Sequence, residues 1–398
     1  MVLKKITDTH TGTITIITEP RSQSDEPTSE VVQKLRSIAV HSLARMYYPE
    51  QRLFAFRLRR NERGEVLEGV SRRYTAVALI GLASEDPCIA AEVLGNHSLN
   101  DVCDRLLDDV VEMDDLGEVA LTTWAARVLG HSKASMAVKA LQRMEPGQRP
   151  YPTVELSWAL TALVVGGSDA TDMAQAEVTA RALLASFRQE SGIFGHWSAG
   201  SKVPRLRAHV SCFADFVYPI QALSHYHLVT GDTRAAEVAC SCAGRMCQLQ
   251  GPAGQWWWHF DIRTGRVLER YPVYAVHQDA MAPMSLLALA KACGQDHSAS
   301  IEKGLNWLIN PPEITGSLVD PEHNIIWRKV ARREPRRLVR GLQAAVSCLH
   351  PGLRVPAADV LFPPISVDYE SRPYEMGWIL HAWPITHELQ SHERLSAH

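Results

Sequence analysis

The sequence has no long apolar run and no excess of positive charge. A membrane-spanning helix needs roughly 18 or more consecutive apolar residues, and every apolar stretch of this chain is interrupted sooner. The formal net charge is −3 at pH 7, which offers no positive surface typical of nucleic-acid binding. We therefore expect no membrane span and no nucleic-acid partner.

The sequence also has little that would indicate secretion or a metal site. The N-terminal stretch MVLKKITDTHTGTITIITEP lacks a continuous apolar core and a small-residue cleavage site. Eight cysteines in 398 residues do not make a disulfide framework. Three of them, Cys240, Cys242 and Cys247, lie close together without the CxxC pairs or nearby histidines of a zinc site. We expect reduced thiols, a cytoplasmic location, no metal and no cofactor.

What the chain does have is a large apolar fraction arranged with helical periodicity. Apolar residues make up 46% of the sequence and charged residues 21%, which is enough to bury a sizeable core. Residues 1–28 form a polar leader with an alternating, strand-like stretch, and few strand signals follow it. We expect a single helical domain over residues 29–390 and a C-terminal tail over residues 391–398.

Six segments share one form, in which a polar cluster is followed by a run of small apolar residues. Because they are apolar nearly all round, we expect them to be buried helices. They are residues 71–83, 114–130, 151–167, 211–231, 277–294 and 371–383. Amphipathic segments lie between them, for example residues 29–47, 173–189 and 233–250. This alternation predicts an all-α fold, an (α/α)6 barrel in which outer helices shield an inner ring.

Two connections between these helices carry a Gln…Gly-x-Trp element. They are RQESGIFGHW, with Gln189, Gly195 and Trp197, and LQGPAGQW, with Gln250, Gly254 and Trp256. This element resembles the QW motif of the terpenoid cyclase and protein prenyltransferase toroids. The resemblance implies that the glutamine caps a helix end and the tryptophan packs over it. The Lys/Arg-Gly head of that motif is missing in both, and the other loops do not match.

In such a barrel the inner helices begin at one end, where a pocket is expected. Nearly every inner helix starts with an acid, tyrosine, histidine or arginine, and a helix N-terminus favours an ionised acid. The predicted catalytic residues are Glu118, Glu155, Asp215, Tyr218, His277, Asp279 and Glu375. We expect Asp279 and one of the other acids to form an acid–base pair, assisted by His277 and Tyr218.

The stretch QWWWHFD predicts a binding platform over this mouth. If Trp256 has a structural role, Trp257 and Trp258 are left to stack against a sugar ring. The predicted substrate-binding residues are Arg73, Tyr74, Trp257, Trp258, His259, Asp261, Tyr274, Gln278, Tyr369, Arg372 and Tyr374. The basic segment 324–341 adds Arg328, Arg332 and Arg333, which would suit an anionic substrate.

These residues favour an enzyme that acts on an oligosaccharide or a polysaccharide. A glycoside hydrolase needs two carboxyl groups, whereas a lyase or a uronate epimerase needs Tyr or His for proton transfer and Arg to neutralise the uronate; the sequence leaves these open. A terpenoid cyclase with Asp279 as general acid is the alternative, although the DxDD motif is absent and aromatic residues are only 7% of the chain. A protein prenyltransferase would need an Asp/Cys/His zinc site, which the sequence does not indicate. A non-catalytic binding toroid is the third possibility, and the oligomeric state is open.

Overall fold

The computed structural model describes residues 2–7, 14–19, 25–166, 169–198, 200–201, 203, 207–334, 338–351, 353, 355 and 358–385. The predicted tail over residues 391–398 lies outside them. In the predicted leader, strands β1 (Val2–Thr7) and β2 (Ile14–Glu19) pair antiparallel. Helix α1 begins at Asp25, earlier than the predicted start at residue 29.

Within the described residues, six helices form a closed inner ring, as the sequence predicted. They are α2 (Arg72–Leu82), α5 (Leu116–Val128), α7 (Thr153–Val164), α9 (Ala214–Thr230), α11 (Ala282–Cys293) and α15 (Pro373–Ala382). Each packs against the next, and α15 returns to pack against α2. A π-helical turn, η3 (His277–Met281), leads directly into α11. The side chains of these helices are mostly buried, because they face the ring centre on one side and the outer helices on the other.

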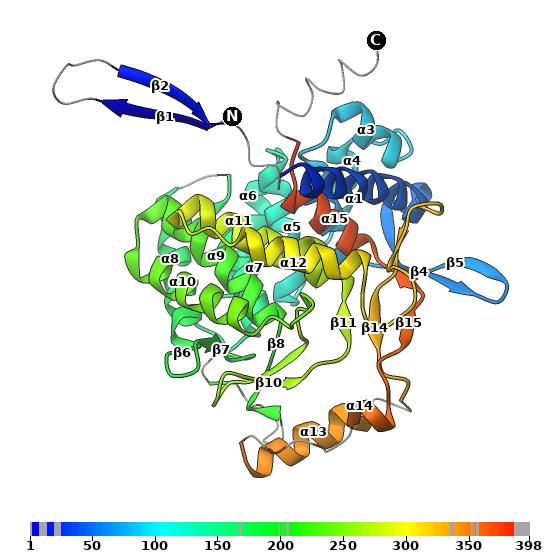
Figure 1. The fold of residues 1–398 in the computed structure, drawn as a ribbon. Helices are drawn as coiled ribbons and strands as arrows, with labels where there is room; N and C mark the ends of the chain where they lie inside the picture. The colour runs from blue at the N-terminus through cyan, green and yellow to red at the C-terminus, as the bar shows by residue number, and fades with distance from the viewer. Residues whose placement is uncertain are drawn as a thin grey trace.

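An outer layer of amphipathic helices covers this ring (Figure 1). It consists of α1 (Asp25–Met46), α4 (Leu99–Leu107), α6 (Ala134–Arg143), α8 (Ala170–Ala185), α10 (Thr233–Gln248) and α12 (Ser298–Ile309), with the short α3 (Pro87–Val93) beside α1. Capping residues in the local sequence fix where some of these helices begin. Ser98 and Asp101 form a capping box at α4, and Asp232 caps α10. The (α/α)6 toroid predicted from the alternation is therefore confirmed.

The ring closes at a seam where α2 and α15 touch through glycine. A Cβ atom added at Gly81 would lie 2.3 Å from the carbonyl oxygen of Gly377, and one added at Gly377 would lie 2.6 Å from the carbonyl oxygen of Val77. No side chain fits at either position without moving a helix backbone. The first and last inner helices therefore approach as closely as their main chains allow.

Short strands gather where the inner helices begin, which the sequence analysis did not anticipate. They are β3 (Tyr47–Tyr48), β4 (Leu53–Asn61), β5 (Gly64–Val70), β6 (Phe187–Arg188), β7 (Ile193–Phe194), β8 (Val210–Cys212), β9 (His259–Asp261), β10 (Arg266–Glu269), β11 (Val273–Tyr274), β12 (Val319–Asp320), β13 (Ile325–Ile326), β14 (Lys329–Ala331), β15 (Ser366–Asp368) and β16 (Glu370–Ser371). The expectation of few strands after the leader was wrong. Most have two to four residues, too few for a visible alternation. Some pair with the next strand along the chain, whereas the pairs β8–β9, β11–β14, β14–β15 and β4–β16 join segments distant in sequence.

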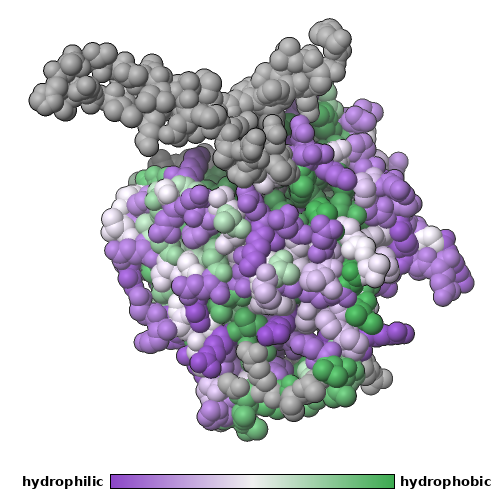
Figure 2. Space-filling view, viewed as in Figure 1, coloured by the Kyte–Doolittle hydropathy of each residue, from purple (hydrophilic) through white to green (hydrophobic). Residues whose placement is uncertain are grey.

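Two helices, α13 (Leu338–Leu349) and α14 (Ala358–Leu361), lie apart from the ring at the strand-bearing end (Figure 1). Figure 2 shows apolar surface there, at the lower edge of the molecule, and Leu349, Val360 and Leu361 are exposed. Among the described residues, no helix has both the length and the apolar character needed to cross a bilayer.

Candidate functional site at the mouth of the ring

A cavity of about 320 Å³ opens where the inner helices begin. Residues near the beginnings of α2, α7, α9, η3 and α15 contribute to its wall. Strand β11 and the segment that precedes β14 contribute further residues. The lining residues are Arg73, Tyr74, Val77, Leu121, Val154, Trp158, Ala214, Tyr218, Trp258, Tyr274, Val276, His277, Met281, Arg328, Tyr374 and Trp378. Seven of the predicted site residues meet in this wall: Arg73, Tyr74, Tyr218, Trp258, Tyr274, His277 and Tyr374.

Half of the sixteen lining residues carry a ring: seven are tryptophan or tyrosine and one is histidine. The rings of Trp158 and Tyr218 meet edge to face at 5.1 Å between centroids, and Tyr74 lies 4.8 Å from Tyr374. Burial raises the pKa values of Tyr218 and Tyr374, so both hydroxyls keep their protons at ordinary pH. The wall can therefore hold the apolar face of a ring-shaped ligand and donate hydrogen bonds to it.

His277 is held as a neutral ring inside this wall. It stacks on Trp258, with ring planes 7° apart and centroids 5.7 Å apart, and lies 4.4 Å from the ring of Phe213. Burial lowers the pKa of His277 to about 3. Nδ1 lies 3.4 Å from the carbonyl oxygen of Trp256, which can only accept, so this partner assigns the hydrogen to Nδ1. Nε2 then carries the lone pair and can accept a proton.

One guanidinium at the cavity edge joins two carboxylates. Nη2 of Arg73 donates to Asp115 and, over 3.0 Å, to Oε1 of Glu155. Burial raises the pKa of Glu155, and the charge of Arg73 partly offsets that rise. The Asp115 carboxylate also caps α5, since it accepts from the backbone N–H of Glu118.

A second guanidinium, that of Arg328, reaches the cavity from the residue that directly precedes β14. It lies over the ring of Tyr274, 5.3 Å from the centroid, and 3.2 Å from the carboxylate of Glu370. Glu370 also contacts the guanidiniums of Arg57 and Arg372. One carboxylate thus serves several cations, and Arg328 lies 3.7 Å from a second carboxylate, that of Asp368.

The predicted acid Asp279 lies behind the wall, fully buried and paired with Glu375. Burial raises the pKa values of both, and the negative charge of Asp279 raises that of Glu375 further. The pair therefore holds a proton, because two adjacent carboxylates in a dry interior cannot both ionise. Neither residue is among those that line the cavity.

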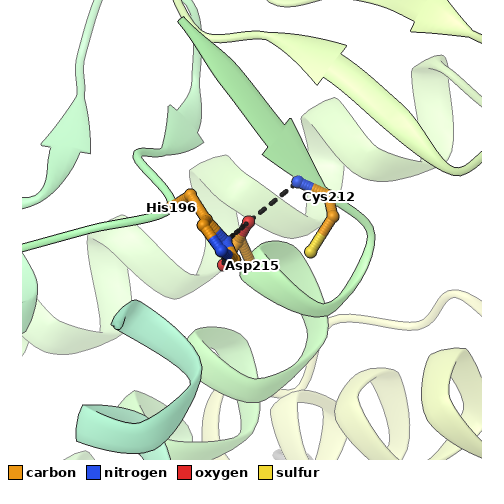
Figure 3. Close-up of side chains that lie close together, drawn as sticks. All are labelled: His196, Cys212 and Asp215. Carbon is orange, nitrogen blue, oxygen red and sulfur yellow. Dashed lines mark hydrogen bonds and ion pairs between the residues drawn. The ribbon is translucent and has the colours of Figure 1, made fainter. Parts of the chain in front are cut away.

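A second hollow of about 380 Å³ lies beside the first, and Trp258 lines both. Here the predicted residue Asp215 meets His196 and Cys212 (Figure 3). Its carboxylate accepts from Nδ1 of His196 at 2.9 Å and from the backbone N–H of Cys212 at 2.8 Å. His259, predicted to bind substrate, lines this hollow and not the aromatic cavity.

Other predicted residues serve neighbouring elements. Trp257 is buried against Tyr271 and Arg270, so it does not present the exposed face expected of it. Asp261 pairs with Arg263, Arg372 donates to Glu370 and to the hydroxyl of Tyr74, and Gln278 donates to the carbonyl of Tyr274. Four further predicted residues lie outside both hollows. Glu118 pairs with Arg72, and Arg332 pairs with Glu269 and Asp359. The backbone N–H of Arg333 donates to the carbonyl of Pro363, and Tyr369 is exposed and contacts Trp327.

Trp158 and Trp378 form part of the cavity wall but were not predicted as site residues. Both belong to segments that were interpreted as uniformly buried helices. A signal was present, because each lies about one helical turn after a mouth residue, Trp158 after Glu155 and Trp378 after Tyr374. The constellation of His196, Cys212 and Asp215 was also missed, because the histidine is distant from the other two in sequence.

Only the second of the two QW-like elements behaves as the resemblance implies. The amide of Gln250 donates to the carbonyls of Gly254 and Ser300, and Trp256 is buried, so this loop ties α10 to α12. In the first element, Gln189 is exposed and Trp197 is 41% exposed. The element is thus a local packing device in one loop.

No protein-family description matches the chain, and no curated protein matches it significantly. Solved structures are similar in fold. An unsaturated glucuronyl hydrolase specific for heparin aligns over 94% of this chain and 99% of its own, with a TM-score of 0.57 and 14% identity. A cellobiose 2-epimerase from Bacillus thermoamylovorans aligns over 90% and 98%, with a TM-score of 0.60 and 9% identity. A sugar epimerase from a ruminal bacterium aligns over 89% of this chain and 97% of its own, with a TM-score of 0.56 and 11% identity.

These similar structures place the chain among α/α toroids whose named members are sugar hydrolases and sugar epimerases. They do not support the resemblance to terpenoid cyclases and prenyltransferases.

Proposed function

We propose that the chain is a carbohydrate-active enzyme whose aromatic cavity binds one sugar unit that carries an acidic group. We further propose that it moves a proton at a carbon of that sugar, as an epimerase or a lyase does. The observation that carries this proposal is the composition of the wall. The described residues that line it supply aromatic rings, two guanidiniums and a neutral imidazole, and no carboxylate.

The aromatic rings account for the sugar. Tyr74, Trp158 and Trp258 offer faces for the C–H surface of a pyranose, and tyrosine hydroxyls offer hydrogen bonds to its hydroxyl groups. The volume of about 320 Å³ suits a ligand of that size better than a long polymer segment. The names of the similar structures, glucuronyl hydrolases and sugar epimerases, agree with this substrate class.

The guanidiniums and the imidazole account for the proton transfer. Arg73 and Arg328 would neutralise the acidic group and the charge that develops beside it when a neighbouring carbon loses its proton. His277 is neutral and presents Nε2 as the acceptor, so it need not lose a proton first. An acidic sugar next to the ring would raise its pKa by charge attraction and make it a stronger base.

A hydrolase is the second candidate, favoured by one observation. Arg73 contacts both Asp115 and Glu155, so two carboxyl groups lie close together at the cavity edge. Burial raises the pKa of Glu155, which suits a general acid. Asp115 would then be the ionised carboxylate that acts as general base or nucleophile.

The test is to incubate the protein in D2O with a panel of uronate-containing oligosaccharides and to follow three products. We expect deuterium at a sugar carbon or an unsaturated uronate, and a loss of about 10²–10⁴-fold in rate in His277→Gln. His41→Gln, at an exposed histidine on α1, is the matched control and should keep full activity. Release of reducing ends without deuterium, abolished by Glu155→Gln and not by His277→Gln, would instead establish the hydrolase.

A further inference from the structure

We propose that His196, Cys212 and Asp215 bind a divalent cation of the zinc class beside the aromatic cavity. The ligand atoms that these side chains offer all lie within 4.8 Å of one another (Figure 3). Ligand atoms around a tetrahedral zinc ion are roughly 3.3–3.6 Å apart, given Zn–N, Zn–O and Zn–S bonds of about 2.0–2.3 Å. Small side-chain rotations would therefore bring the three to bonding distance. The inference does not depend on the proposed sugar chemistry.

The main chain holds each of the three residues in place. The carbonyl of His196 accepts from the backbone N–H of Thr153 at the start of α7. Cys212 ends β8 and pairs with His259 on β9, and Asp215 lies in the first turn of α9. Because three different elements hold the ligands, the site is prepared before an ion arrives, which lowers the entropy cost of binding.

The Asp215 carboxylate is oriented by its surroundings in the way that metal-binding carboxylates are. Oδ2 accepts from Oγ of Ser211 at 3.2 Å and from the backbone N–H of Cys212 at 2.8 Å. Both oxygens contact Nδ1 of His196, Oδ2 at 2.9 Å and Oδ1 at 3.1 Å. A cation between the carboxylate and the imidazole nitrogen would replace the proton that the two now share, while the bonds from Ser211 and Cys212 keep the carboxylate fixed.

The donor set favours zinc over the harder cations. Calcium and magnesium take oxygen ligands, whereas one nitrogen, one sulfur and one oxygen suit zinc and metals of similar softness. Three protein ligands leave a fourth position, as in zinc sites that hold a water molecule or a substrate atom.

That fourth position would face the second hollow. The hollow is lined by His196, Trp197, Val203, Arg207, Val210, Ser211, Cys212, Trp258 and His259. The side chain of His196 is 41% exposed, so an ion has a route of entry. A guanidinium, Arg207, lies at the same hollow and would suit an anionic group that completes the coordination of the cation. The ligand class is thus a small anion or an acidic group held jointly by the metal and Arg207.

A cysteine nucleophile activated by histidine is the competing interpretation of the same residues. The imidazole of His196 contacts the Asp215 carboxylate at 2.9 Å, and the backbone N–H of Cys212 donates to the same carboxylate at 2.8 Å. Because Nδ1 of His196 is directed at this carboxylate, the imidazole is not placed as the base that would take the proton of the thiol.

The test is to treat the full-length chain with a chelator, dialyse it and titrate it with Co²⁺ while recording the absorption spectrum. We expect one equivalent per chain, a thiolate-to-cobalt charge-transfer band, the visible bands of tetrahedral cobalt, and displacement by Zn²⁺. Cys212→Ser should abolish the charge-transfer band. His196→Gln, at a half-exposed side chain outside a helix, should weaken binding by at least about 100-fold and serves if the first variant does not fold.

Cys240→Ser is the matched control, because Cys240 lies elsewhere, against Cys293. It should bind Co²⁺ as the wild type does. Absence of stoichiometric binding, or a band that survives Cys212→Ser, would overturn the proposal. Because no sugar is present, the result is independent of whether the proposed sugar chemistry is correct.

Discussion

Two buried glutamates, Glu370 and Glu375, lie on either side of the start of α15 and show how partners decide the state of a carboxyl group. Glu370 contacts Arg57 at 3.0 Å and Arg328 at 3.2 Å, and it also pairs with Arg372. Glu375 instead faces Asp279. Both are at most 2% exposed. Burial is the same for both, but one is an ion-pair centre and the other is half of a pair that holds a proton.

Removing the ion-pair centre should have the largest effect. Glu370→Gln leaves several guanidiniums around a neutral amide, and we expect the free energy of unfolding to fall by about 3–5 kcal/mol. Denaturant unfolding at pH 7 measures it. Glu68→Gln is the control, because Glu68 pairs with the same Arg57 at a more exposed position and should cost less than about 1 kcal/mol. Equal losses in the two variants would contradict the contrast.

The proton-holding pair should be visible as a pH dependence. The folded-state pKa of Glu375 is raised above its ordinary value of 4.5, so the unfolded chain releases this proton at lower pH. The stabilisation is complete below about pH 4.5 and is lost as pH rises towards the folded-state pKa, by at most about 1.4 kcal/mol per pH unit for one proton. Glu375→Gln should therefore gain stability relative to wild type between pH 5 and 8. Parallel stability curves would show that the pair carries no extra proton.

The smallest change is expected for Asp279→Asn at pH 5. The new amide can donate to Glu375 where a shared proton now lies, so the free energy of unfolding should stay within about 1 kcal/mol of wild type. Differential scanning calorimetry measures this directly. Because stability is preserved, any loss of activity in this variant would report on the predicted catalytic role of Asp279, which lies outside the cavity wall. A loss above about 3 kcal/mol would instead mark Asp279 as structural.

The inner helices were predictable because their composition is local information. A segment such as residues 277–294 is apolar all round, and only a position between two layers accommodates that. The mouth residues were predictable for the same reason, since Tyr74, His277 and Tyr374 begin such segments. The second hollow was not predictable in this way. Its histidine and its cysteine are brought together by β8, β9 and a loop bound to α7, and these pairings connect residues distant in sequence.

Contacts between residues distant in sequence also explain why the different roles of the predicted acids could not be predicted. From the sequence, Asp279 and Glu155 are both acids at the start of an inner helix. Only the packing shows that one faces another carboxyl group behind the wall and the other a guanidinium at the cavity edge. Sequence periodicity places a residue along a helix, but the partner across the ring sets its chemistry.

The glycine seam between α2 and α15 has a consequence for how the protein is made. Arg372, at the start of α15, bonds to Tyr74 across 298 residues of chain. During synthesis the ring must therefore stay open until nearly all of the domain has left the ribosome. The apolar flank of α2 stays uncovered until α15 packs against it. Gly377 is among the last residues needed, so a chain cut short just before it would contain His196, Cys212 and Asp215 but would lack Trp378 of the cavity wall and the helix that closes the barrel.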